Sequence, residues 1–251
     1  MAGLAIIGGT GLTALNNLEI KRRQEIRTPY GEPSGPLVHG QLGNSDVVFL
    51  PRHGHAHTIP PHRVNYRANI WALRESGVHS VIAVAAVGGI SQELPPGRLG
   101  FPHQIIDYTW CRQHTYFEDD LEQVTHIDFT EPYSEPLRQL LITASRQLHV
   151  DAVGQGIYAA TQGPRLETAA EIDRLERDGC SMVGMTGMPE AALARELGLA
   201  YASCAVVANW AAGRGTGPIS MQDIEYSLVS GMANVRRLLE AAIPMLDVSQ
   251  P

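Results

Sequence analysis

The sequence predicts a single α/β domain over residues 1–251, in which helices flank a central mixed β-sheet. Short apolar runs rich in β-branched residues alternate with segments of helical periodicity, a pattern typical of α/β folds. The chain has 251 residues, of which 44% are hydrophobic, and this is enough to bury one large core. No linker rich in proline and serine, internal repeat or shift in composition divides the sequence.

Seven short apolar runs account for the expected strands. They cover residues 4–7, 47–50, 81–87, 105–106, 156–161, 182–185 and 201–208. In open α/β sheets the loops that follow the strands carry the functional site. The residues at these strand ends are therefore the first candidates for chemistry.

Three segments account for the expected helices. The segment 167–178 places its apolar residues on one face. The segment 189–197 begins with a proline, which suits the first turn of a helix. Residues 221–246 predict a long terminal helix or a pair of helices.

Charge and composition exclude several classes of partner. With 19 basic residues, 26 acidic residues, a net charge of -7 and no dense basic run, a nucleic-acid surface is not expected. No apolar run reaches the ~20 residues of a membrane span, and the first residues lack an export signal. The three cysteines form no CxxC pair, which suits the reducing cytoplasm. Lys21 is the only lysine, so a Walker-type phosphate loop and a Schiff-base lysine are both missing.

A glycine-rich loop directly follows the first expected strand. Adjacent glycines let backbone N–H groups approach an anion, and the Thr10 hydroxyl adds a donor. A dinucleotide-binding fold would use the same position, since Gly9, Gly11 and Ala14 fit the pattern G-x-G-x-x-A. That fold also requires an acidic residue about 20 positions later, whereas residues 21–33 are charged and turn-rich, with Glu25 and Glu32 in no clear strand. An anion site, a nicotinamide site and a plain tight turn are the three interpretations.

Three histidines, His53, His55 and His57, follow the second expected strand at alternate positions. Alternation by two would place them on one face of a strand, as in some metal-binding patterns. The adjacent Arg52 would repel a dication, and a guanidinium suits bidentate contact with a phosphate. Phosphate binding, metal binding and a solvated or core histidine cluster are the alternatives left open by the residues.

Two further loops have the composition of anion sites. Ala85 and Ala86 lie near the end of a buried strand, where small side chains allow backbone N–H groups to face a ligand or allow strands to pack closely. Residues 184–190 again join a strand to the first turn of a helix, with the Thr186 hydroxyl between them. A third turn of this kind favours a phosphate site assembled from several loops.

Asn209 stands at the end of the last expected strand. A single amide at a strand end suits recognition of the polar edge of a small planar heterocycle. Asparagine also ends many strands simply as a turn former. The first interpretation gains weight from the phosphate-compatible loops.

Together, five motifs resemble those of the trimeric purine nucleoside phosphorylases, and most of all their 5'-methylthioadenosine phosphorylase branch. The motifs occur in order along almost the whole chain, at residues 8–12, 52–57, 61–70, 163–168 and 184–190. The resemblance implies one α/β domain with a mixed sheet, a homotrimer, and no metal or organic cofactor. It also implies phosphate rather than metal at the histidine cluster.

The resemblance assigns a phosphate site and a reaction. It places inorganic phosphate on Thr10, Arg52, His53, Ala85, Ala86 and Thr186. It places the ribose at Met185. The implied reaction is phosphorolysis, in which phosphate displaces the purine from the sugar through a cationic transition state. Orientation and charge placement would supply most of the catalysis.

The residues that read the base differ from the adenine-specific branch, which carries aspartates where this chain has Asn209 and Ala211. A neutral amide can donate to N7 or to a 6-oxo oxygen, whereas an aspartate would repel that oxygen. Glu167 also favours a 6-oxopurine, because a carboxylate accepts N1–H of hypoxanthine or guanine. The alternative role of Glu167 is that of an acid at a helix N-terminus. Leu166 and Trp210 adjoin these residues and are also expected to contact the substrate.

The 5' end of the substrate is expected to meet Met221 and Ile224. Inosine-type phosphorylases offer a histidine here, whereas Met221 packs readily against a methylthio group; the alternative is core packing of a helix. His126 resembles a residue that reaches in from a neighbouring subunit. Together these features predict phosphorolysis of 5'-methylthioinosine to hypoxanthine and 5-methylthioribose 1-phosphate. A general 6-oxopurine phosphorylase and a methylthioadenosine phosphorylase are the alternatives.

Overall fold

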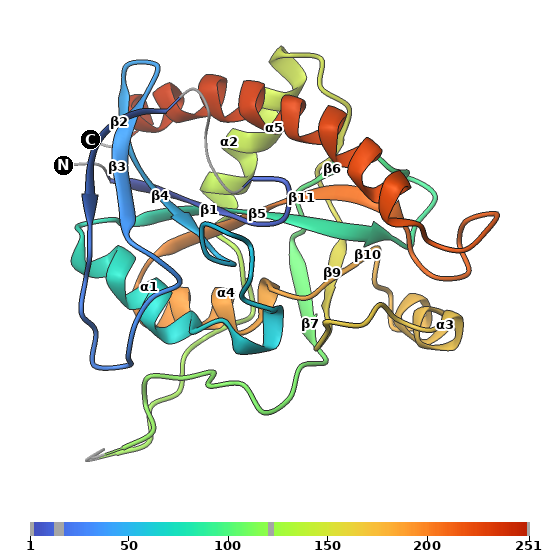
Figure 1. Ribbon diagram of the computed structural model, residues 1–251, viewed down its shortest axis with the longest axis horizontal. Coiled ribbons are helices and arrows are strands. Elements are labelled where there is room, and N and C mark those ends of the chain that lie inside the picture. The colour runs from blue at the N-terminus through green and yellow to red at the C-terminus, as the bar shows by residue number, and fades with distance from the viewer. Residues whose placement is uncertain (1–2, 13–17, 120–122, 250–251) are drawn as a thin grey trace.

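Eleven strands form one mixed β-sheet (Figure 1). The computed structural model describes residues 3–12, 18–119 and 123–249. In chain order the strands are β1 (Leu4–Gly8), β2 (Glu19–Gln24), β3 (Leu37–Leu42), β4 (Ser45–Pro51), β5 (Ser80–Gly89), β6 (Leu99–Gly100), β7 (Gln104–Asp107), β8 (Ala152–Val153), β9 (Ile157–Ala160), β10 (Met182–Gly184) and β11 (Ala200–Trp210). Their spatial order is β2-β3-β4-β1-β5-β10-β9-β7, and β11 joins β5 to β6 and, through β6, to β8.

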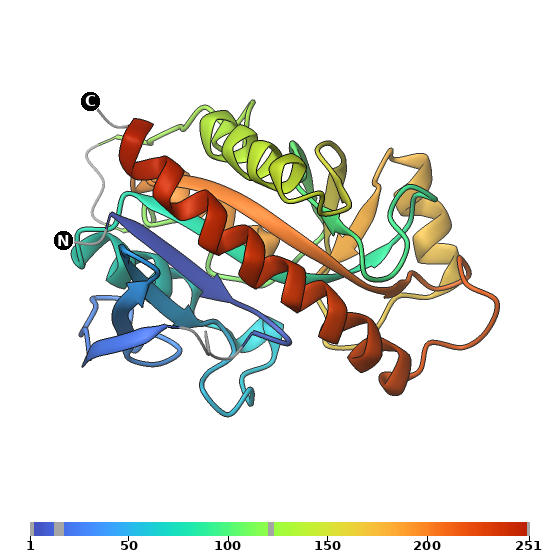
Figure 2. The same cartoon turned by 90° about the horizontal axis from the view of Figure 1, so that it is seen from above.

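Helices cover both faces of this sheet. The α-helices of the described residues are α1 (Tyr66–Glu75), α2 (Glu135–Gln147), α3 (Ala169–Arg177), α4 (Gly187–Glu196) and α5 (Met221–Ser249), with a short 3-10 helix at Pro61–Arg63. Helices α2 and α5 lie on one face, and α1 and α4 lie on the other, as the two views agree (Figures 1 and 2). Within the described residues, none of these helices has the length and apolarity needed to cross a membrane.

The core has two layers because side chains alternate along each strand with a period of two. In β1, Leu4 and Ile6 belong to the core that also contains side chains of α2 and α5. Ala5 and Ile7 belong to the core that contains side chains of α1 and α4. A strand covered on both faces is a continuous apolar run, and for this reason the apolar runs predicted the central strands.

One edge of β5 changes its neighbour along its length. Residues 80–83 pair with β1 in parallel, and residues 88–89 pair with β10 in antiparallel. Among the strands that the structure describes, none pairs with residues 84–87 on this edge, while β11 pairs along β5 on the other. A point at which strand neighbours diverge leaves a crevice suited to a ligand.

Strand β11 is irregular where it pairs with Val87 and Gly88, at the end of the unpaired edge of β5. Val207 pairs with Val87 and Asn209 pairs with Gly88, so Ala208 is an extra residue in the ladder. A β-bulge of this kind changes the direction of the side chains around it. Ala208 and Asn209, although consecutive, therefore line the same cavity.

The seven expected strands and the three expected helices are confirmed, with changed bounds. Strand β11 continues to Trp210, so Asn209 lies inside the strand, and β10 ends at Gly184, so Met185 belongs to the turn that follows. Helix α5 is one continuous helix through Pro244 rather than a pair. The sequence did not predict α1, α2, β3, β6 and β8.

Residues 21–24 belong to β2, a strand that the sequence did not predict, whereas Glu25 and Glu32 lie in no strand, as expected. The side chains of β2 are mostly exposed, so its pairing with β3 holds it at the edge of the sheet. Charged side chains protect such an edge from pairing with another chain. Because β2 pairs antiparallel with β3, it does not complete the βαβ unit that a dinucleotide fold requires. Ala14, the last residue of that motif, lies outside the described residues.

Candidate active site

A cavity of about 450 Å³ opens beside the unpaired edge of β5. Its walls come from stretches of chain within residues 9–10, 52–61, 85–88, 164–167, 183–186, 208–212 and 219–224. The expected site residues on these walls are Thr10, Arg52, His53, Ala85, Ala86, Leu166, Glu167, Met185, Thr186, Asn209, Ala211, Met221 and Ile224. Folding thus brings together residues that are up to about two hundred positions apart in the sequence.

Arg52, which follows β4, forms a buried ion pair with Glu190 of α4. Its Nε and Nη2 donate to the two carboxylate oxygens, each over 2.7 Å. The Tyr201 hydroxyl donates to Oε1 of the same carboxylate over 2.8 Å. Arg52 is 1% exposed and Glu190 is 0% exposed. Burial alone would lower the pKa of Arg52, but the charge and hydrogen bonds of Glu190 outweigh burial and raise it, so Arg52 is a cation.

The ion pair leaves part of the guanidinium for a ligand. Nη1 of Arg52 donates to the Val84 carbonyl over 2.9 Å, at the start of the unpaired edge of β5. A guanidinium has five N–H groups, and partners within the described residues use three of them. Two N–H groups therefore have no partner among the described residues, and Arg52 lines the cavity. Gly9 is tightly packed here, because a Cβ at this position would lie 2.8 Å from Nη1.

Backbone and hydroxyl groups continue the same wall. Alternate residues of a strand direct their N–H and C=O groups to the same edge. Because the Val84 carbonyl faces the gap beside β5, the N–H of Ala86 is expected to face it too. Thr186 is 6% exposed and lies at the N-cap of α4, where its side chain does not cap the helix. The N-terminus of α4 adds a positive potential.

His53 is a neutral imidazole at this wall. Its Nδ1 lies 2.8 Å from the Ile59 carbonyl oxygen, so Nδ1 carries the proton and Nε2 holds a lone pair. Burial, followed by the charge of Arg52, lowers the pKa of His53 to about 4. The His57 ring packs edge-on against the His53 ring, with 4.8 Å between the ring centroids. Oγ1 of Thr10 lies 3.4 Å from Nε2 of His57. These contacts join the glycine-rich loop to the histidine loop.

The three alternating histidines do not share one face of a strand, as the metal interpretation required. They lie in turns after β4, and His55 is exposed whereas His53 is buried. In the part of the chain that the structure describes, no group of three or more His, Cys, Asp or Glu side chains could hold a metal ion. The fold instead gathers Arg52, His53 and Thr10 at one wall of the cavity.

Asn209 has one amide N–H available for a ligand. Its Nδ2 donates to the Trp210 carbonyl over 2.7 Å, and an amide also has a second N–H and a carbonyl oxygen. Ala211 is 2% exposed and packs against Gly88, so it contributes only a small apolar surface. This wall carries no carboxylate at either position.

Glu167 is held by Thr161, whose hydroxyl donates to Oε1 over 2.7 Å. Its alternative role as the acid of a helix N-terminus is filled by other residues, because Thr168 and Glu171 form the capping box of α3. Glu167 therefore lines the cavity with its carboxylate already oriented by one hydrogen bond. Leu166, 43% exposed, lines the cavity beside it.

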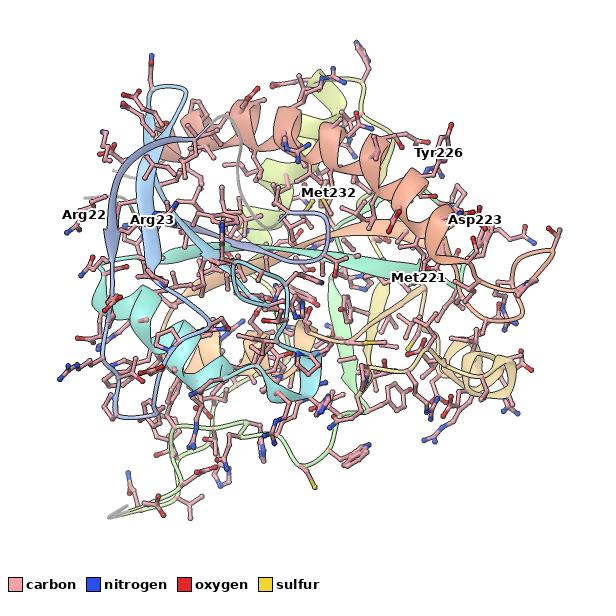
Figure 3. The ribbon with its side chains drawn as sticks, viewed as in Figure 1. Arg22, Arg23, Met221, Asp223, Tyr226 and Met232 are labelled. Carbon is pink, nitrogen blue, oxygen red and sulfur yellow. The ribbon has the colours of Figure 1, made fainter. Side chains whose placement is uncertain are left out.

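Met221, Ile224 and Ile219 form an apolar end of the cavity. Figure 3 shows Met221 at the N-terminal end of α5. Met221 is 66% exposed, so it is not the core residue that the packing alternative required, whereas Ile224 belongs both to the core and to the cavity wall. The apolar end lies on a different stretch of chain from Arg52 and from Glu167.

Two expected site residues do not line the cavity within one chain. Trp210 follows Asn209 in β11, and side chains of successive strand residues point to opposite faces. His126 is exposed in the segment between β7 and α2. The cavity also contains residues that sequence reasoning missed, among them residues 58–60 and Ile219. Only their closeness in sequence to the histidine loop and to Met221 could have indicated these residues.

Comparison with known proteins places this site in context. The family model of the phosphorylase superfamily matches residues 4–244. A probable S-methyl-5'-thioinosine phosphorylase of Pseudomonas syringae pv. tomato is 56% identical over 239 residues, which are 95% of this chain and 97% of that protein. The 6-oxopurine nucleoside phosphorylase of Pyrococcus furiosus is 43% identical over 251 residues, covering 98% of this chain and 94% of that protein.

A solved structure is similar over the whole chain. Methylthioadenosine phosphorylase from Schistosoma mansoni in complex with adenine matches with a TM-score of 0.95 and 32% sequence identity, covering 100% of this chain and 93% of that one. This similarity confirms the single α/β domain with a mixed sheet.

Glu190→Gln is expected to destabilise the protein, because it leaves the Arg52 charge buried without its counterion. We expect the free energy of unfolding to fall by about 3 kcal/mol, measured by urea denaturation. Glu176→Gln is the matched control, since Glu176 pairs with Arg214 at the surface and should change stability by less than about 1 kcal/mol. Equal effects of the two substitutions would contradict the importance of the buried pair.

His53 is expected to make stability depend on pH. Its pKa is about 4 in the folded chain, against 6.5 as the ordinary value, so the unfolded chain binds the additional proton as pH falls from 6.5 to 4. Stability is therefore fully present above pH 6.5 and decreases below it, by about 3 kcal/mol for a shift of this size. The unfolding free energy of His53→Gln should show a smaller decrease over this window. The exposed His55→Gln serves as control, and a wild-type pH slope in His53→Gln would contradict this assignment.

Proposed function

Because the chain belongs to the phosphorylase superfamily, we propose that it cleaves S-methyl-5'-thioinosine with phosphate, reversibly, to hypoxanthine and 5-methylthioribose 1-phosphate. One observation carries this proposal: a single cavity has a wall of hydrogen-bond donors around Arg52, a wall with an amide and a carboxylate, and an apolar end. These three parts match the phosphate, the 6-oxopurine and the methylthio group. The relative named as a probable S-methyl-5'-thioinosine phosphorylase supports the same substrate.

Phosphate would bind at the wall that contains Arg52. The two N–H groups of Arg52 that have no protein partner, the hydroxyls of Thr10 and Thr186 and the backbone N–H of Ala86 would donate to the phosphate oxygens, and Ala85 would line the same wall. Because His53 is neutral, the lone pair on its Nε2 would accept a hydrogen bond from the protonated oxygen of the phosphate. This set of donors would hold the nucleophile beneath C1' of the sugar, with Met185 against the ribose.

Cleavage would proceed by displacement at C1'. The bond from C1' to the purine nitrogen breaks as a phosphate oxygen approaches, so the sugar becomes cationic and the purine takes up the electron pair. The bound phosphate anion stabilises the sugar cation, and the orientation of the two reactants lowers the barrier. The proposed reaction needs phosphate as co-substrate and neither a metal nor an organic cofactor.

The base would be read by Asn209 and Glu167. The free amide N–H of Asn209 would donate to N7 or to the 6-oxo oxygen, where negative charge accumulates as the purine leaves. The Glu167 carboxylate, already held by Thr161, would accept N1–H of hypoxanthine. Adenine has a lone pair on N1, so a carboxylate in this place would disfavour it.

The 5' substituent would lie against Met221, Ile224 and Ile219, which offer apolar contacts to sulfur and methyl groups. A 5'-hydroxyl would find no polar side chain among these three residues. The products would return a purine base and a sugar phosphate to salvage.

A homotrimer is part of the proposal, with His126 directed toward the site of a neighbouring subunit. The exposure of His126, away from the cavity of its own chain, supports a role between subunits. We also propose a cytoplasmic location, which the three unpaired cysteines suit.

A general 6-oxopurine nucleoside phosphorylase is the second candidate. It shares the base-reading residues and is favoured by the 43% identity to the 6-oxopurine nucleoside phosphorylase of Pyrococcus furiosus. It differs only at the 5' end of the substrate, which would lie near Met221, a side chain that is 66% exposed.

The reaction class is tested by incubating the protein with S-methyl-5'-thioinosine, with and without inorganic phosphate, and separating the products by chromatography. We expect hypoxanthine and 5-methylthioribose 1-phosphate in equal amounts, and only in the presence of phosphate. Release of hypoxanthine without phosphate, or a requirement for added nicotinamide, would overturn phosphorolysis.

Asn209→Asp is expected to shift base preference toward 6-aminopurines. The substitution removes the N–H groups that reach the purine and the Trp210 carbonyl, and places a negative charge beside a 6-oxo oxygen. We expect kcat/KM for the 6-oxopurine nucleoside to fall by at least about 100-fold, a loss typical of a site with unpaired polar groups. The readout is the ratio of kcat/KM for 6-oxopurine and 6-aminopurine nucleosides. An unchanged ratio would mean that Asn209 does not read the base.

A further inference from the structure

Arg112 lies in a long segment between β7 and α2 that contains no helix or strand in its described parts, residues 108–119 and 123–134. Segments of this length without regular structure are uncommon in compact domains and are often functional. The segment is fastened to α4, because the Thr115 hydroxyl and the Tyr116 N–H each donate to the Glu196 carboxylate over 2.7 Å. Arg112 is thus carried on an anchored part of the chain.

The guanidinium of Arg112 is hydrogen-bonded to two separate loops. Its Nη2 donates to the carbonyls of Thr161 and Gln162 over 3.3 Å and 2.8 Å, and its Nε donates to Oε1 of Gln162 over 3.1 Å. Its Nη1 donates to the carbonyls of Met185 and Met188 over 2.8 Å and 2.7 Å. One rigid planar group therefore joins both loops, which a flexible point charge could not do.

The two loops carry different parts of the proposed site. The first contains Thr161, whose hydroxyl holds the base-facing Glu167. The second contains Met185 and Thr186, at the proposed ribose and phosphate positions. The loops touch at Gly163, where φ is 60° and a Cβ would lie 2.3 Å from Sδ of Met185. The guanidinium bonds both loops next to this contact.

Arg112 is also connected to a third wall of the cavity, through the hydroxyl of Tyr66 in α1. Nη1 of Arg112 donates to the Tyr66 hydroxyl over 3.3 Å, and this hydroxyl donates to the Pro61 carbonyl over 3.0 Å. Pro61 lines the cavity at the end of the histidine loop. The guanidinium also lies over the Tyr66 ring, 5.5 Å from its centroid, in a cation–π contact.

We propose that Arg112 is a positioning residue that holds the base-facing loop and the ribose- and phosphate-facing loop in a fixed register. Arg112 is not among the described residues that line the cavity, so it acts through the carbonyls it binds. The proposal rests on the proposed function, which assigns the base to one loop and the ribose and phosphate to the other.

The relative position of the two loops affects the rate of a reaction only if the reacting groups contact both loops. Of the two loops that Arg112 joins, inorganic phosphate alone or hypoxanthine alone would contact mainly one, and its affinity would not require the other loop to be aligned. Nucleoside and phosphate together span both loops, and misplacement of reacting groups by about 1 Å costs about 100-fold in rate. Loss of Arg112 should therefore reduce catalysis far more than the binding of either fragment.

The test compares Arg112→Met and Arg112→Lys with the wild-type chain. For Arg112→Met we expect kcat/KM for the nucleoside to fall about 100-fold, while Kd for phosphate and Kd for hypoxanthine, by calorimetry, change less than about threefold. Lysine keeps the charge but lacks the planar fork, so Arg112→Lys should show the same pattern.

Arg67→Met is the matched control, because Arg67 fastens the same segment at other points. Its Nη1 donates to the Thr115 carbonyl over 3.3 Å and to the Glu118 carboxylate over 2.7 Å. We expect kcat/KM of this variant to stay within about threefold of wild type, as for a partly exposed ion pair. An effect as large as that of Arg112→Met would mean that the anchoring of the segment, and not the register of the loops, is responsible.

Three further results would overturn the role of Arg112. These are an unchanged kcat/KM, a parallel loss of affinity for phosphate and hypoxanthine, and unfolding of both variants, which would make Arg112 a stability residue. The assay uses whichever purine nucleoside the wild-type chain cleaves. Failure of the wild-type chain to cleave any of them would overturn the proposed function, and this result is distinct because it precedes any substitution.

Discussion

Along one edge of β5, the neighbouring strand changes from β1 to β10, and in the described sheet no strand pairs with residues 84–87 on this edge. The cavity opens beside this divergence. The loop after β1, the loop after β4 and the turn after β10 all meet at the gap, and β11 brings Asn209 to it from the other edge of β5. The small side chains of Ala85 and Ala86 leave the backbone accessible at the same place.

The Arg52–Glu190 ion pair lies beside this gap, because Nη1 of Arg52 donates to the Val84 carbonyl, and the pair sets the charge of this part of the cavity wall. Burying two charges costs several kcal/mol per ion, and a buried pair is weak evidence for stability. Glu190 fixes the guanidinium through two hydrogen bonds, and two N–H groups of Arg52 are left without a partner among the described residues. Since Glu190 balances the charge of Arg52 and His53 is neutral, the wall offers oriented donors rather than a large excess of positive charge. Preorganised donors of this kind suit a phosphate that must bind and then react.

The sequence predicted those features that depend on local pattern. The central strands are continuous apolar runs because both faces are covered, and the loops at their ends carry glycine, arginine and hydroxyl residues whose chemistry is visible without a structure. Strand β2 was missed because its exposed side chains have no apolar pattern and only pairing with β3 makes it a strand. Helix α1 was not predicted, because residues 61–70 were interpreted only as a motif of the family and not by their helical periodicity.

Features that depend on distant contacts could not be predicted. Glu190 lies 138 positions from Arg52, and no spacing rule relates an arginine to a carboxylate so far along the chain. The bulge at Ala208 is a property of the pairing between β11 and β5. Trp210 was expected at the substrate because it adjoins Asn209, but its side chain does not line the cavity. Arg112 carries no motif, and its role becomes visible only when the loops it joins are placed side by side.

Substrate choice is the central claim, and the ranking of kcat/KM for three nucleosides tests it most directly. We expect S-methyl-5'-thioinosine to be preferred over inosine, because of the apolar 5' end, and over methylthioadenosine, because of Asn209 and Glu167. A preference for inosine would contradict the role given to Met221 and Ile224. A preference for methylthioadenosine would contradict the reading of the base by an amide and a carboxylate.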